Sequence, residues 1–259
     1  MSFDFRMTPG RALTSFLSAS VISILLSALV FTGCDLPGAE SRDSLVHTQA
    51  EDNTRQGLAP SQPDPLVPGR KPEILIIGDS MMQFGIGPAL KKGLENKGYQ
   101  VTYFVKKSTG LTWTHFFDWQ YKSQELLSSG DFNAIIVMLG SNDGRWLKHE
   151  GKRLPFGPDV ALWWQQYSLR FDEFFGRLCN ETGKVFWVGM PPMKPKAYHD
   201  KTRLFNRFYN QKIQNSGCGR YIHTDYLSTE RPTRWKDGIH VSNSGGQMVA
   251  QRILKDTGL

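Results

Sequence analysis

A serine, a histidine and an aspartate stand where they could form an activated nucleophile. Ser80 follows Gly78 and Asp79 directly after an apolar run and opens a helical segment, where free backbone N–H groups and the helix dipole favour developing negative charge. Asp237 stands three residues before His240. At this spacing a carboxylate can hold one ring nitrogen and leave the other free as a base. The alternatives are a Ser80 that only caps the helix and a loop histidine with a chance acidic neighbour.

Gly110 and Asn142 are the candidates for binding an oxyanion. Each follows an apolar run that is predicted as a strand. The side-chain amide of Asn142 can donate a hydrogen bond to a developing oxyanion, and a glycine at position 110 lets a backbone N–H approach a ligand closely. An Asx-type turn at Asn142 and an ordinary turn at Gly110 are the structural alternatives.

Short apolar runs alternate with helical segments and must position these residues. The runs predicted as strands are 73–77, 101–105, 132–139, 185–190 and 220–223. The predicted helices are 81–97, 114–128, 160–182, 199–215 and a last helix capped by Ser242. This alternation predicts an α/β fold, a three-layer α/β/α sandwich with a five-stranded parallel sheet of flavodoxin-like order. Ligands bind such sheets beyond the carboxyl ends of the strands, which is the edge that the candidate residues occupy.

The order Ser, Gly, Asn and Asp-x-x-His resembles that of the GDSL, or SGNH, hydrolase superfamily, which is named for these four blocks. The resemblance covers about 72–255, and the segment GDSMM departs from the common GDSL at its fourth residue. The segments STGLT, VMLGSND, FWVGMPPM and KDGIHVSNSGG are similar to a bacterial envelope branch of the superfamily whose substrates are poorly defined. The resemblance implies the SGNH hydrolase fold.

Carried over by position, the resemblance implies a role for each residue. Ser80 would attack an ester carbonyl, His240 would take its proton and pass it to the leaving alcohol, and Asp237 would orient the histidine. The oxyanion hole would consist of the backbone N–H groups of Ser80 and Gly110 and the side chain of Asn142. The acyl-serine intermediate would then meet water, as in an esterase, or a sugar hydroxyl, as in a transferase.

No cofactor and no metal are expected. Gly85 and Gly87 resemble the start of a dinucleotide-binding loop, but Leu90 stands where its third glycine should be, so this motif is set aside. The sequence has no C-x-x-C pair and no cysteine–histidine cluster with zinc spacing. The G-x-S-x-G elbow of the α/β-hydrolases is absent around Ser80.

Residues 1–34 have the plan of a secretory signal. Arg6 and Arg11 precede an uncharged window that contains the apolar stretch VISILLSALVF and ends at FTGC. Small residues before Cys34 resemble the bacterial lipobox, in which the cysteine receives lipid and becomes the mature N-terminus. An uncleaved signal anchor is the rival interpretation, because the window is just long enough to span a bilayer.

We divide the chain into a signal peptide with lipobox (1–34), a flexible linker (35–70) and a hydrolase domain (71–259). The linker has too few large apolar groups to form a core. The expected location is the periplasmic side of the bacterial cell envelope, with the protein held at the membrane by its N-terminal lipid. A membrane acyltransferase is a further partner that this location allows.

The net charge of +7 is spread along the chain rather than gathered in one run. A solvated surface is the plain interpretation, and attraction to an anionic envelope polymer or lipid headgroup is the sharper one. The export signal and the lack of a nucleic-acid-binding motif argue against nucleic acid as a partner.

Cys179 and Cys218 remain in the domain, the number for one disulfide in an oxidising compartment. Each stands shortly before a predicted strand, and right-handed crossovers put the two preceding helices on one face of the sheet. We therefore predict a disulfide at the amino edge of the sheet, far from Ser80. Two unrelated buried thiols are the alternative.

Aromatic and basic residues flank the candidate site. The aromatic and histidine residues that follow Gly110 are Trp113, His115, Phe116, Phe117 and Trp119. We expect some to line the rim of the site and others to pack under the sheet edge, with Trp113 the most exposed and a substrate contact. Residues 144–158 are predicted as a long loop or lid. Arg145 in this loop would meet an anionic substrate, and a solvated charge is the alternative.

Three functional hypotheses follow. The first is a serine esterase or O-acyltransferase that acts on ester-linked acyl groups, above all acetyl, of an envelope polysaccharide or another acylated substrate. The second is a lipolytic or aryl esterase. The third is a non-catalytic accessory protein that binds glycan, against which the full set of Ser80, Asn142, Asp237 and His240 argues.

Overall fold

The predicted strands form one parallel sheet in the computed structural model, which describes residues 70–259 apart from 232 and 236. The strands are β1 (Glu73–Gly78), β2 (Gln100–Val105), β3 (Phe132–Met138), β6 (Val185–Val188) and β7 (Arg220–Ile222). Their order across the sheet is β2-β1-β3-β6-β7, which is the flavodoxin-like order expected. The predicted signal peptide, Cys34 and the linker up to residue 69 lie outside the described residues.

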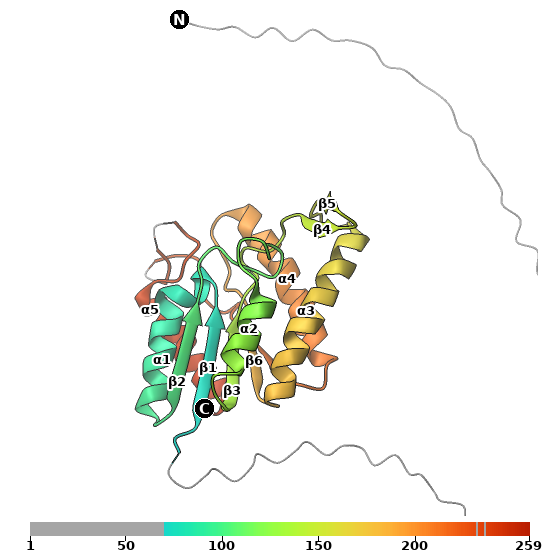
Figure 1. Cartoon of the computed structure of the whole chain (residues 1–259). Helices are drawn as coiled ribbons and strands as arrows, with labels where there is room; N and C mark the ends of the chain where they lie inside the picture. The colour runs from blue at the N-terminus through green and yellow to red at the C-terminus, as the bar shows by residue number, and fades with distance from the viewer. Residues whose placement is uncertain (1–69, 232, 236) are drawn as a thin grey trace, which may run out of the picture. The chain divides into compact units, whose positions relative to one another are not determined.

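Helices cover both faces of this sheet, as the three-layer prediction requires (Figure 1). One face carries α1 (Gly87–Asn96) and α5 (Asn243–Thr257). The other carries α2 (Trp119–Leu127), α3 (Ala161–Glu181) and α4 (Lys196–Gln214). Within the described part of the chain, no helix combines the length and the apolar character needed to cross a membrane.

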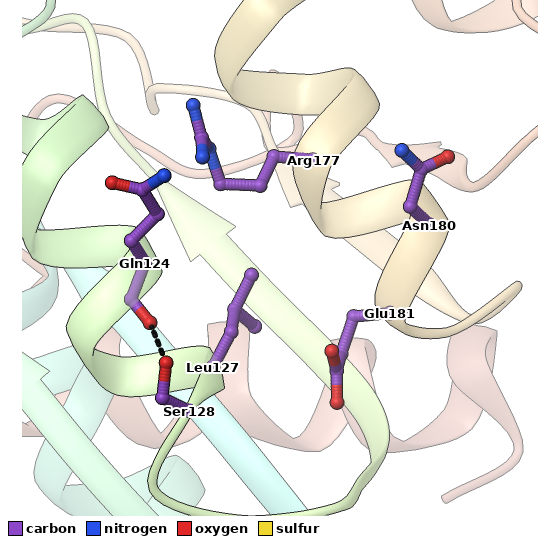
Figure 2. A pocket seen from close by; sticks show the side chains of 6 residues that line it. All are labelled: Gln124, Leu127, Ser128, Arg177, Asn180 and Glu181. Atoms are coloured by element: carbon purple, nitrogen blue, oxygen red, sulfur yellow. Dashed lines mark hydrogen bonds between the residues drawn. The ribbon is translucent and has the colours of Figure 1, made fainter.

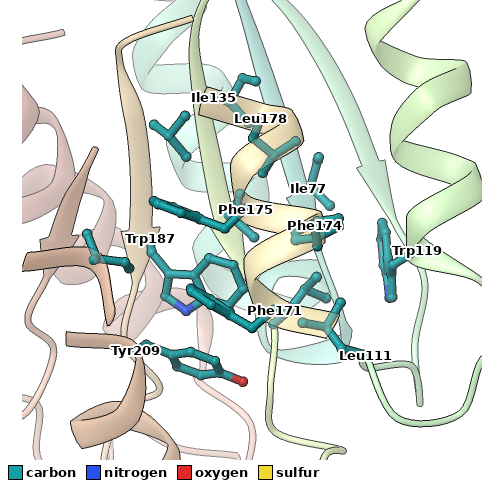
Figure 3. Packing of buried hydrophobic residues seen from close by; sticks show 14 of the residues in the cluster. Ile77, Leu111, Trp119, Ile135, Phe171, Phe174, Phe175, Leu178, Trp187 and Tyr209 are labelled. Carbon is teal, nitrogen blue, oxygen red and sulfur yellow. The ribbon is translucent and has the colours of Figure 1, made fainter. Parts of the chain in front are cut away.

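The central strands are buried on both sides, which is why they occur as continuous apolar runs in the sequence. Every residue of β1 is buried. Leu75 faces α2, α3 and α4, whereas Ile76 faces α1 and α5, because side chains alternate along a strand. The core between β6, α3 and α4 is aromatic, with the rings of Trp187 and Tyr209 4.6 Å apart at their centroids (Figure 3).

The first predicted helix is broken in the structure. An irregular helical turn, η1 (Met82–Ile86), precedes α1, and the backbone of Phe84 and Gly85 is not helical. Gly85 has a φ of +71°, in the left-handed region that favours glycine. A Cβ atom at Gly85 would lie 2.6 Å from the carbonyl oxygen of Val241 and 2.5 Å from that of Ser242. Glycine is therefore required here for η1 to meet the segment before α5.

The second predicted helix and the predicted long loop also differ from expectation. α2 begins at 119 rather than at 114, because Asp118 caps it and accepts hydrogen bonds from two backbone N–H groups of the first turn. The loop predicted over 144–158 contains an antiparallel hairpin, β4 (Leu147–His149) and β5 (Lys152–Leu154). Both residues of its turn have positive φ, as a two-residue hairpin turn commonly requires. The hairpin lies beyond the carboxyl end of the sheet, beside the start of α3 (Figure 1).

Cys179 and Cys218 form a disulfide, with their Cα atoms 6.0 Å apart. Cys179 lies in the last turn of α3, and Cys218 lies between α4 and β7. Both positions belong to the amino end of the sheet, whereas Ser80 follows β1 at the carboxyl end. The predicted pairing and its place in the fold are therefore both present in the structure.

Candidate active site

Ser80, His240 and Asp237 form a continuous hydrogen-bonded line. Nε2 of His240 lies 3.1 Å from Oγ of Ser80, and Nδ1 lies 2.7 Å from Oδ2 of Asp237. The other oxygen of Asp237 accepts hydrogen bonds from the backbone N–H groups of Ile239 and His240 at 2.9 and 3.0 Å. The aspartate thus holds the imidazole with one nitrogen facing the serine, which is the arrangement that a serine nucleophile and its base require.

Hydrogen bonds favour the ionised form of Asp237. Partial burial opposes ionisation, but the hydrogen bonds from the His240 ring and from two backbone N–H groups outweigh it and lower the pKa of Asp237 below its usual value. Arg234 braces the same loop, because its guanidinium donates to the carbonyl oxygens of Pro192 and Ile239. An ionised Asp237 can stabilise the imidazolium that forms when His240 takes the proton of the serine.

Ser80 and His240 are 160 residues apart in the chain and meet because η1 packs against the start of α5. Gly246, in the first turn of α5, comes so close that a Cβ atom on it would lie 2.1 Å from the carbonyl carbon of Gly85. The side chain of Phe84 stands edge-to-face on the His240 ring at 5.3 Å and is 40% exposed. Two glycines thus close the gap between the nucleophile and its base.

Asn142 follows β3 at the same sheet edge, and its side-chain amide is held by three acceptors. Nδ2 donates to the carbonyl oxygen of Thr109 at 3.0 Å, and it lies 3.1 Å from Oγ of Ser141 and 3.3 Å from Oδ2 of Asp79. The hydroxyl of Ser141 donates to the same Asp79 oxygen at 2.7 Å. An oxyanion bound by Asn142 would replace one of these acceptors, as catalytic hydrogen bonds often form fully only in the complex with substrate.

Gly110 is placed by a second buried carboxylate, Asp143. This carboxylate accepts a hydrogen bond from the backbone N–H of Thr112 at 2.9 Å and another from the hydroxyl of Tyr167 at 2.7 Å. A Cβ atom at Gly110 would lie 2.5 Å from Oδ1 of Asp143. Only glycine fits at position 110, and Asp143 positions the backbone that would donate to the oxyanion beside Asn142.

Burial raises the pKa of both carboxylates. It raises the pKa of Asp79 to about 6, although the hydrogen bonds from Ser141 and from the Met81 backbone oppose the shift. Burial also raises the pKa of Asp143, against the hydrogen bond from Tyr167. Neither carboxylate belongs to the line that contains Ser80, and we regard both as positioning residues for the two oxyanion donors.

The structure brings Trp113 and Arg145 together beside Asn142. Cζ of Arg145 lies 3.8 Å from the ring centroid of Trp113, and its Nε donates to the carbonyl oxygen of Asn142 at 3.1 Å. The prediction that Trp113 is the most exposed of its group is wrong, because it is partly buried whereas Phe116 is 52% exposed. Trp119 packs in the core, so the expected mixture of rim and core residues is present.

Asp79, Asp143 and Phe84 were not singled out from the sequence as parts of the site. The two aspartates stand inside the motifs, but a local pattern does not show that a carboxylate is buried. For Phe84, the sequence did contain a signal of the close contact between η1 and the last helix: the pair Gly245-Gly246 in the first turn of that helix. Adjacent glycines destabilise a helix, so their presence indicates a close backbone approach.

Two cavities lie outside the hydrogen-bonded line. One of about 360 Å³ lies between the C-terminal parts of α2 and α3, at the end of the domain away from Ser80 (Figure 2). Its lining residues are Gln124, Leu127, Ser128, Arg177, Asn180 and Glu181. The other, of about 300 Å³, lies beside the Asp237 loop and includes Lys194, Arg231 and Trp235.

In the described part of the chain, no group of three acidic, histidine or cysteine side chains could hold a metal ion.

Several solved structures share this fold. TesA is 18% identical, with a TM-score of 0.51 over 71% of this chain and 99% of that chain. The esterase EstA from Pseudoalteromonas sp. is 11% identical, with a TM-score of 0.53 over 71% of this chain and 94% of that chain. The acetylxylan esterase Axe2 from Geobacillus stearothermophilus is 12% identical, with a TM-score of 0.51 over 73% of this chain and 94% of that chain. At these identities the similarity establishes the fold.

The family to which the chain belongs is defined by sequence rather than by a known activity. No curated protein matches the chain. The family model described as "Protein of unknown function (DUF459)" matches residues 73–256, a range that contains the sheet and every residue of the candidate site. The chain therefore belongs to the DUF459 family and has the fold of the SGNH hydrolases, as the order of its motifs indicated.

Proposed function

We propose that the protein is a serine esterase or O-acyltransferase that works through an acyl-Ser80 intermediate on acyl groups, above all acetyl, of an envelope carbohydrate. The observation that carries the proposal is the line from Asp237 through His240 to Ser80, with both ring nitrogens of the histidine engaged. Such a line activates a serine hydroxyl for attack on an ester carbonyl.

The reaction divides into two balanced steps. In the first, Oγ of Ser80 attacks the ester carbonyl while Nε2 of His240 takes its proton, and the resulting oxyanion is bound by the backbone N–H groups of Ser80 and Gly110 and by Asn142. The C–O bond of the ester then breaks, and the leaving alcohol takes the proton from His240. In the second, water or a sugar hydroxyl gives its proton to His240 and attacks the acyl carbonyl. The bond between the acyl carbon and Oγ of Ser80 then breaks, and His240 returns the proton to the serine oxygen.

Aromatic and basic side chains beside the line favour a carbohydrate substrate. Trp235 is 47% exposed and lines the cavity of about 300 Å³ next to the Asp237 loop, together with Lys194 and Arg231. An exposed indole gives a sugar ring a flat apolar surface on which to stack, and the neighbouring cations can bind its hydroxyl groups. The shared fold of the acetylxylan esterase Axe2 is consistent with acetyl groups on a glycan.

The N-terminal sequence supports an envelope location for this activity. The charge-free apolar window that ends at Cys34 has the features of a lipoprotein signal, and the linker to residue 70 would hold the domain off the membrane. In this location the protein would meet envelope polysaccharide directly. A membrane acyltransferase that supplies acyl groups is the partner that a transferase reaction would require.

A lipolytic or aryl esterase is the second candidate, and one observation favours it. Phe84 stands edge-to-face against His240 and is 40% exposed, so an apolar acyl chain or aryl group could pack on it beside the reacting atoms. A glycan-binding protein without catalytic activity does not require hydrogen bonds from Asp237 through His240 to Ser80, so these hydrogen bonds argue against the third hypothesis.

Hydrolysis assays separate these functions. The wild-type protein is offered acetylated sugars and 4-nitrophenyl esters of short and long acyl chains, and Ser80→Ala and Ser128→Ala are assayed beside it. Ser128 is an exposed serine at the end of α2 and serves as the matched control. We expect acetylated sugars to be preferred, Ser80→Ala to fall to background and Ser128→Ala to match the wild type. Preference for long-chain esters would favour the lipolytic alternative, and full activity of Ser80→Ala would overturn the proposal.

A further inference from the structure

We propose that Arg145 is the anion-binding residue of a substrate subsite beside the oxyanion hole. The inference rests on the function proposed above and makes its substrate class narrower: the substrate carries a carboxylate or phosphate group close to the ester. Three features of the structure lead to this assignment, namely how Arg145 is held, which of its donors remain unused and which cations surround it.

Arg145 is fixed on three sides. Its backbone carbonyl accepts a hydrogen bond from Nε1 of the buried Trp163 at 2.8 Å. Its Nε donates to the carbonyl oxygen of Asn142 at 3.1 Å, and its guanidinium lies on the ring of Trp113 at 3.8 Å. A long side chain held in this way loses little conformational freedom when it binds a ligand.

Within the described residues, 70–259 apart from 232 and 236, the terminal Nη atoms of Arg145 have no carboxylate partner. Arg252 differs in this respect, because it also stacks on an aromatic ring, that of Tyr226 at 5.3 Å, but its Nε donates to Asp256 at 2.6 Å. A guanidinium with a free outer edge presents a planar fork that matches a carboxylate or a phosphate. Arg145 is therefore prepared for an anion that the protein itself does not supply.

A row of stacked side chains holds this guanidinium against the hairpin. Arg153 lies 4.6 Å from the ring of Trp146, and Trp146 is stacked on His115 at 5.6 Å. His115 in turn lies 5.4 Å from Trp113, on whose ring the guanidinium of Arg145 packs. The row joins the segment after β2 to the β4–β5 hairpin. It forms an aromatic wall of the kind on which sugar rings stack, with the cation of Arg145 at the end nearest Asn142.

A second cation lies near Arg145. The alkyl stem of Lys201 packs on Gly144, where an added Cβ atom would lie 2.9 Å from Cδ of the lysine. Burial lowers the pKa of Lys201, and the charge of Arg145 acts in the same direction while the buried Asp143 opposes it. An anion bound by Arg145 would relieve the repulsion between the two cations, which adds to the favourable binding free energy.

The hairpin beyond Arg145 is basic. Lys148, Lys152 and Arg153 project from it as exposed residues, against one acidic residue, Glu150. Charges of one sign at the rim of a site raise the local concentration of an oppositely charged ligand. Because Asn142 both anchors Arg145 and belongs to the proposed oxyanion hole, the bound anion would lie next to the ester and not on a remote part of the substrate.

Paired substrates test the assignment and show which part of the substrate carries the charge. An anionic acyl group is tested by mono-4-nitrophenyl succinate against 4-nitrophenyl acetate, and an anionic alcohol by acetylated methyl glucuronide against acetylated methyl glucoside. We expect the wild type to prefer the charged member of one pair. In Arg145→Gln the ratio of kcat/KM values, charged over neutral, should fall by about 10- to 100-fold, the worth of a charged hydrogen bond.

Two further variants keep this test decisive. Arg145→Lys retains the charge without the planar fork, so its ratio should lie between those of the wild type and Arg145→Gln. Arg252→Gln removes an arginine that also stacks on an aromatic ring, and its ratio should equal that of the wild type. A wild type without preference for either charged substrate, or equal ratios in all variants, would overturn the proposal.

A binding measurement keeps the subsite separate from catalysis. Ser80→Ala protein is titrated calorimetrically with glucuronate, glucose 6-phosphate and glucose, with and without Arg145→Gln. We expect an anionic sugar to bind about 10-fold or more tightly than glucose, and this advantage to vanish in the double variant. If the protein binds the anionic sugar in this way but has no esterase activity, the proposed function is wrong and the subsite stands. If glucose and both anionic sugars bind with equal affinity, the subsite is wrong and the proposed function stands.

Discussion

Oδ2 of Asp79 lies 3.3 Å from Nδ2 of Asn142, so a buried carboxylate next to the nucleophile holds the side chain that we assign to the oxyanion hole. The hydroxyl of Ser141 donates to the same oxygen at 2.7 Å and lies between the two residues. A second buried carboxylate, Asp143, packs against Gly110 in the same manner. Two of the three proposed oxyanion donors, Asn142 and Gly110, are thus each braced by an aspartate that does not touch the reacting atoms.

The raised pKa of Asp79 predicts a pH-dependent stability. Because this pKa is about 6, the folded protein retains a proton on Asp79 at pH values where the unfolded chain has lost it. The contribution of this group to stability is therefore fully present below the unfolded pKa and falls as the pH rises to about 6. Asp79→Asn removes this dependence, so the stability of the variant relative to the wild type should improve by roughly 1 kcal/mol from about pH 5 to about pH 7.5.

Urea unfolding at the two pH values measures this change, with Asp159→Asn, at an exposed loop position, as the control. The control should show no such change relative to the wild type. Parallel behaviour of Asp79→Asn and the wild type across this range would contradict the assigned pKa. An asparagine at 79 has a single acceptor oxygen, so it cannot accept the side-chain hydrogen bonds of Ser141 and Asn142 and also that of the Met81 backbone N–H. We therefore expect kcat of the variant to fall even where its stability improves.

Removing the oxyanion side chain should slow the chemical step. Asn142→Ala is expected to lower kcat by about 10²–10³-fold, the usual effect of losing one oxyanion donor. Ser141→Ala keeps the Asn142 amide on Thr109 and Asp79, so its kcat should fall by about tenfold or less. Steady-state kinetics on a short-chain ester separates the two. A change confined to KM in Asn142→Ala would mean that this residue binds substrate rather than stabilising the transition state.

The Cys179–Cys218 disulfide should stabilise the domain from the end opposite the site. It joins residues 39 apart, and closing a loop of this length stabilises a fold by about 4 kcal/mol in the chain-entropy model. Replacing both cysteines by alanine should lower the free energy of unfolding by up to this amount and leave kcat nearly unchanged. Peptide mapping with alkylation before and after reduction should find both thiols protected in protein from the envelope; free thiols there would refute the bond.

The proposed lipid anchor is tested at Cys34. In cells, Cys34→Ala should abolish labelling by a lipid precursor and shift the protein away from the membrane fraction, because the lipobox would have lost its acceptor. Replacement of Arg6 by lysine keeps the positive charge of the n-region and serves as a control that should label normally. Unchanged size and membrane retention of Cys34→Ala would instead favour an uncleaved signal anchor.

The sheet and the line from Asp237 to Ser80 could be predicted from the sequence because both depend on local patterns. Strands buried on two faces are continuous apolar runs, and the order of the runs determines which residues share the carboxyl edge. The break at Phe84 and Gly85 was not predicted, because glycine is tolerated inside a helix and does not by itself mark a break. Its cause lies in the backbone of Val241 and Ser242, which is distant in the sequence.

The residues that brace the oxyanion hole could not be predicted from local sequence patterns for the same reason: their partners are distant in the sequence. Asp143 follows a strand at the site edge, where an acid is equally consistent with a catalytic role. Its role as a brace became visible only from its full burial and from Tyr167 on α3, which donates to it. The exposure of Trp113 was misjudged because Arg145, which covers it, belongs to the segment before β4 and is distant in the sequence.

The most direct test of the central claim is the mass of the intact protein after brief incubation with 4-nitrophenyl acetate and quenching in acid. We expect a fraction of the wild type to gain the mass of one acetyl group, peptide mapping to place this group on Ser80, and Ser80→Ala to gain none. Acetylation at another residue with Ser80 unmodified, or ester turnover by Ser80→Ala at the wild-type rate, would contradict the assignment of Ser80 as the nucleophile.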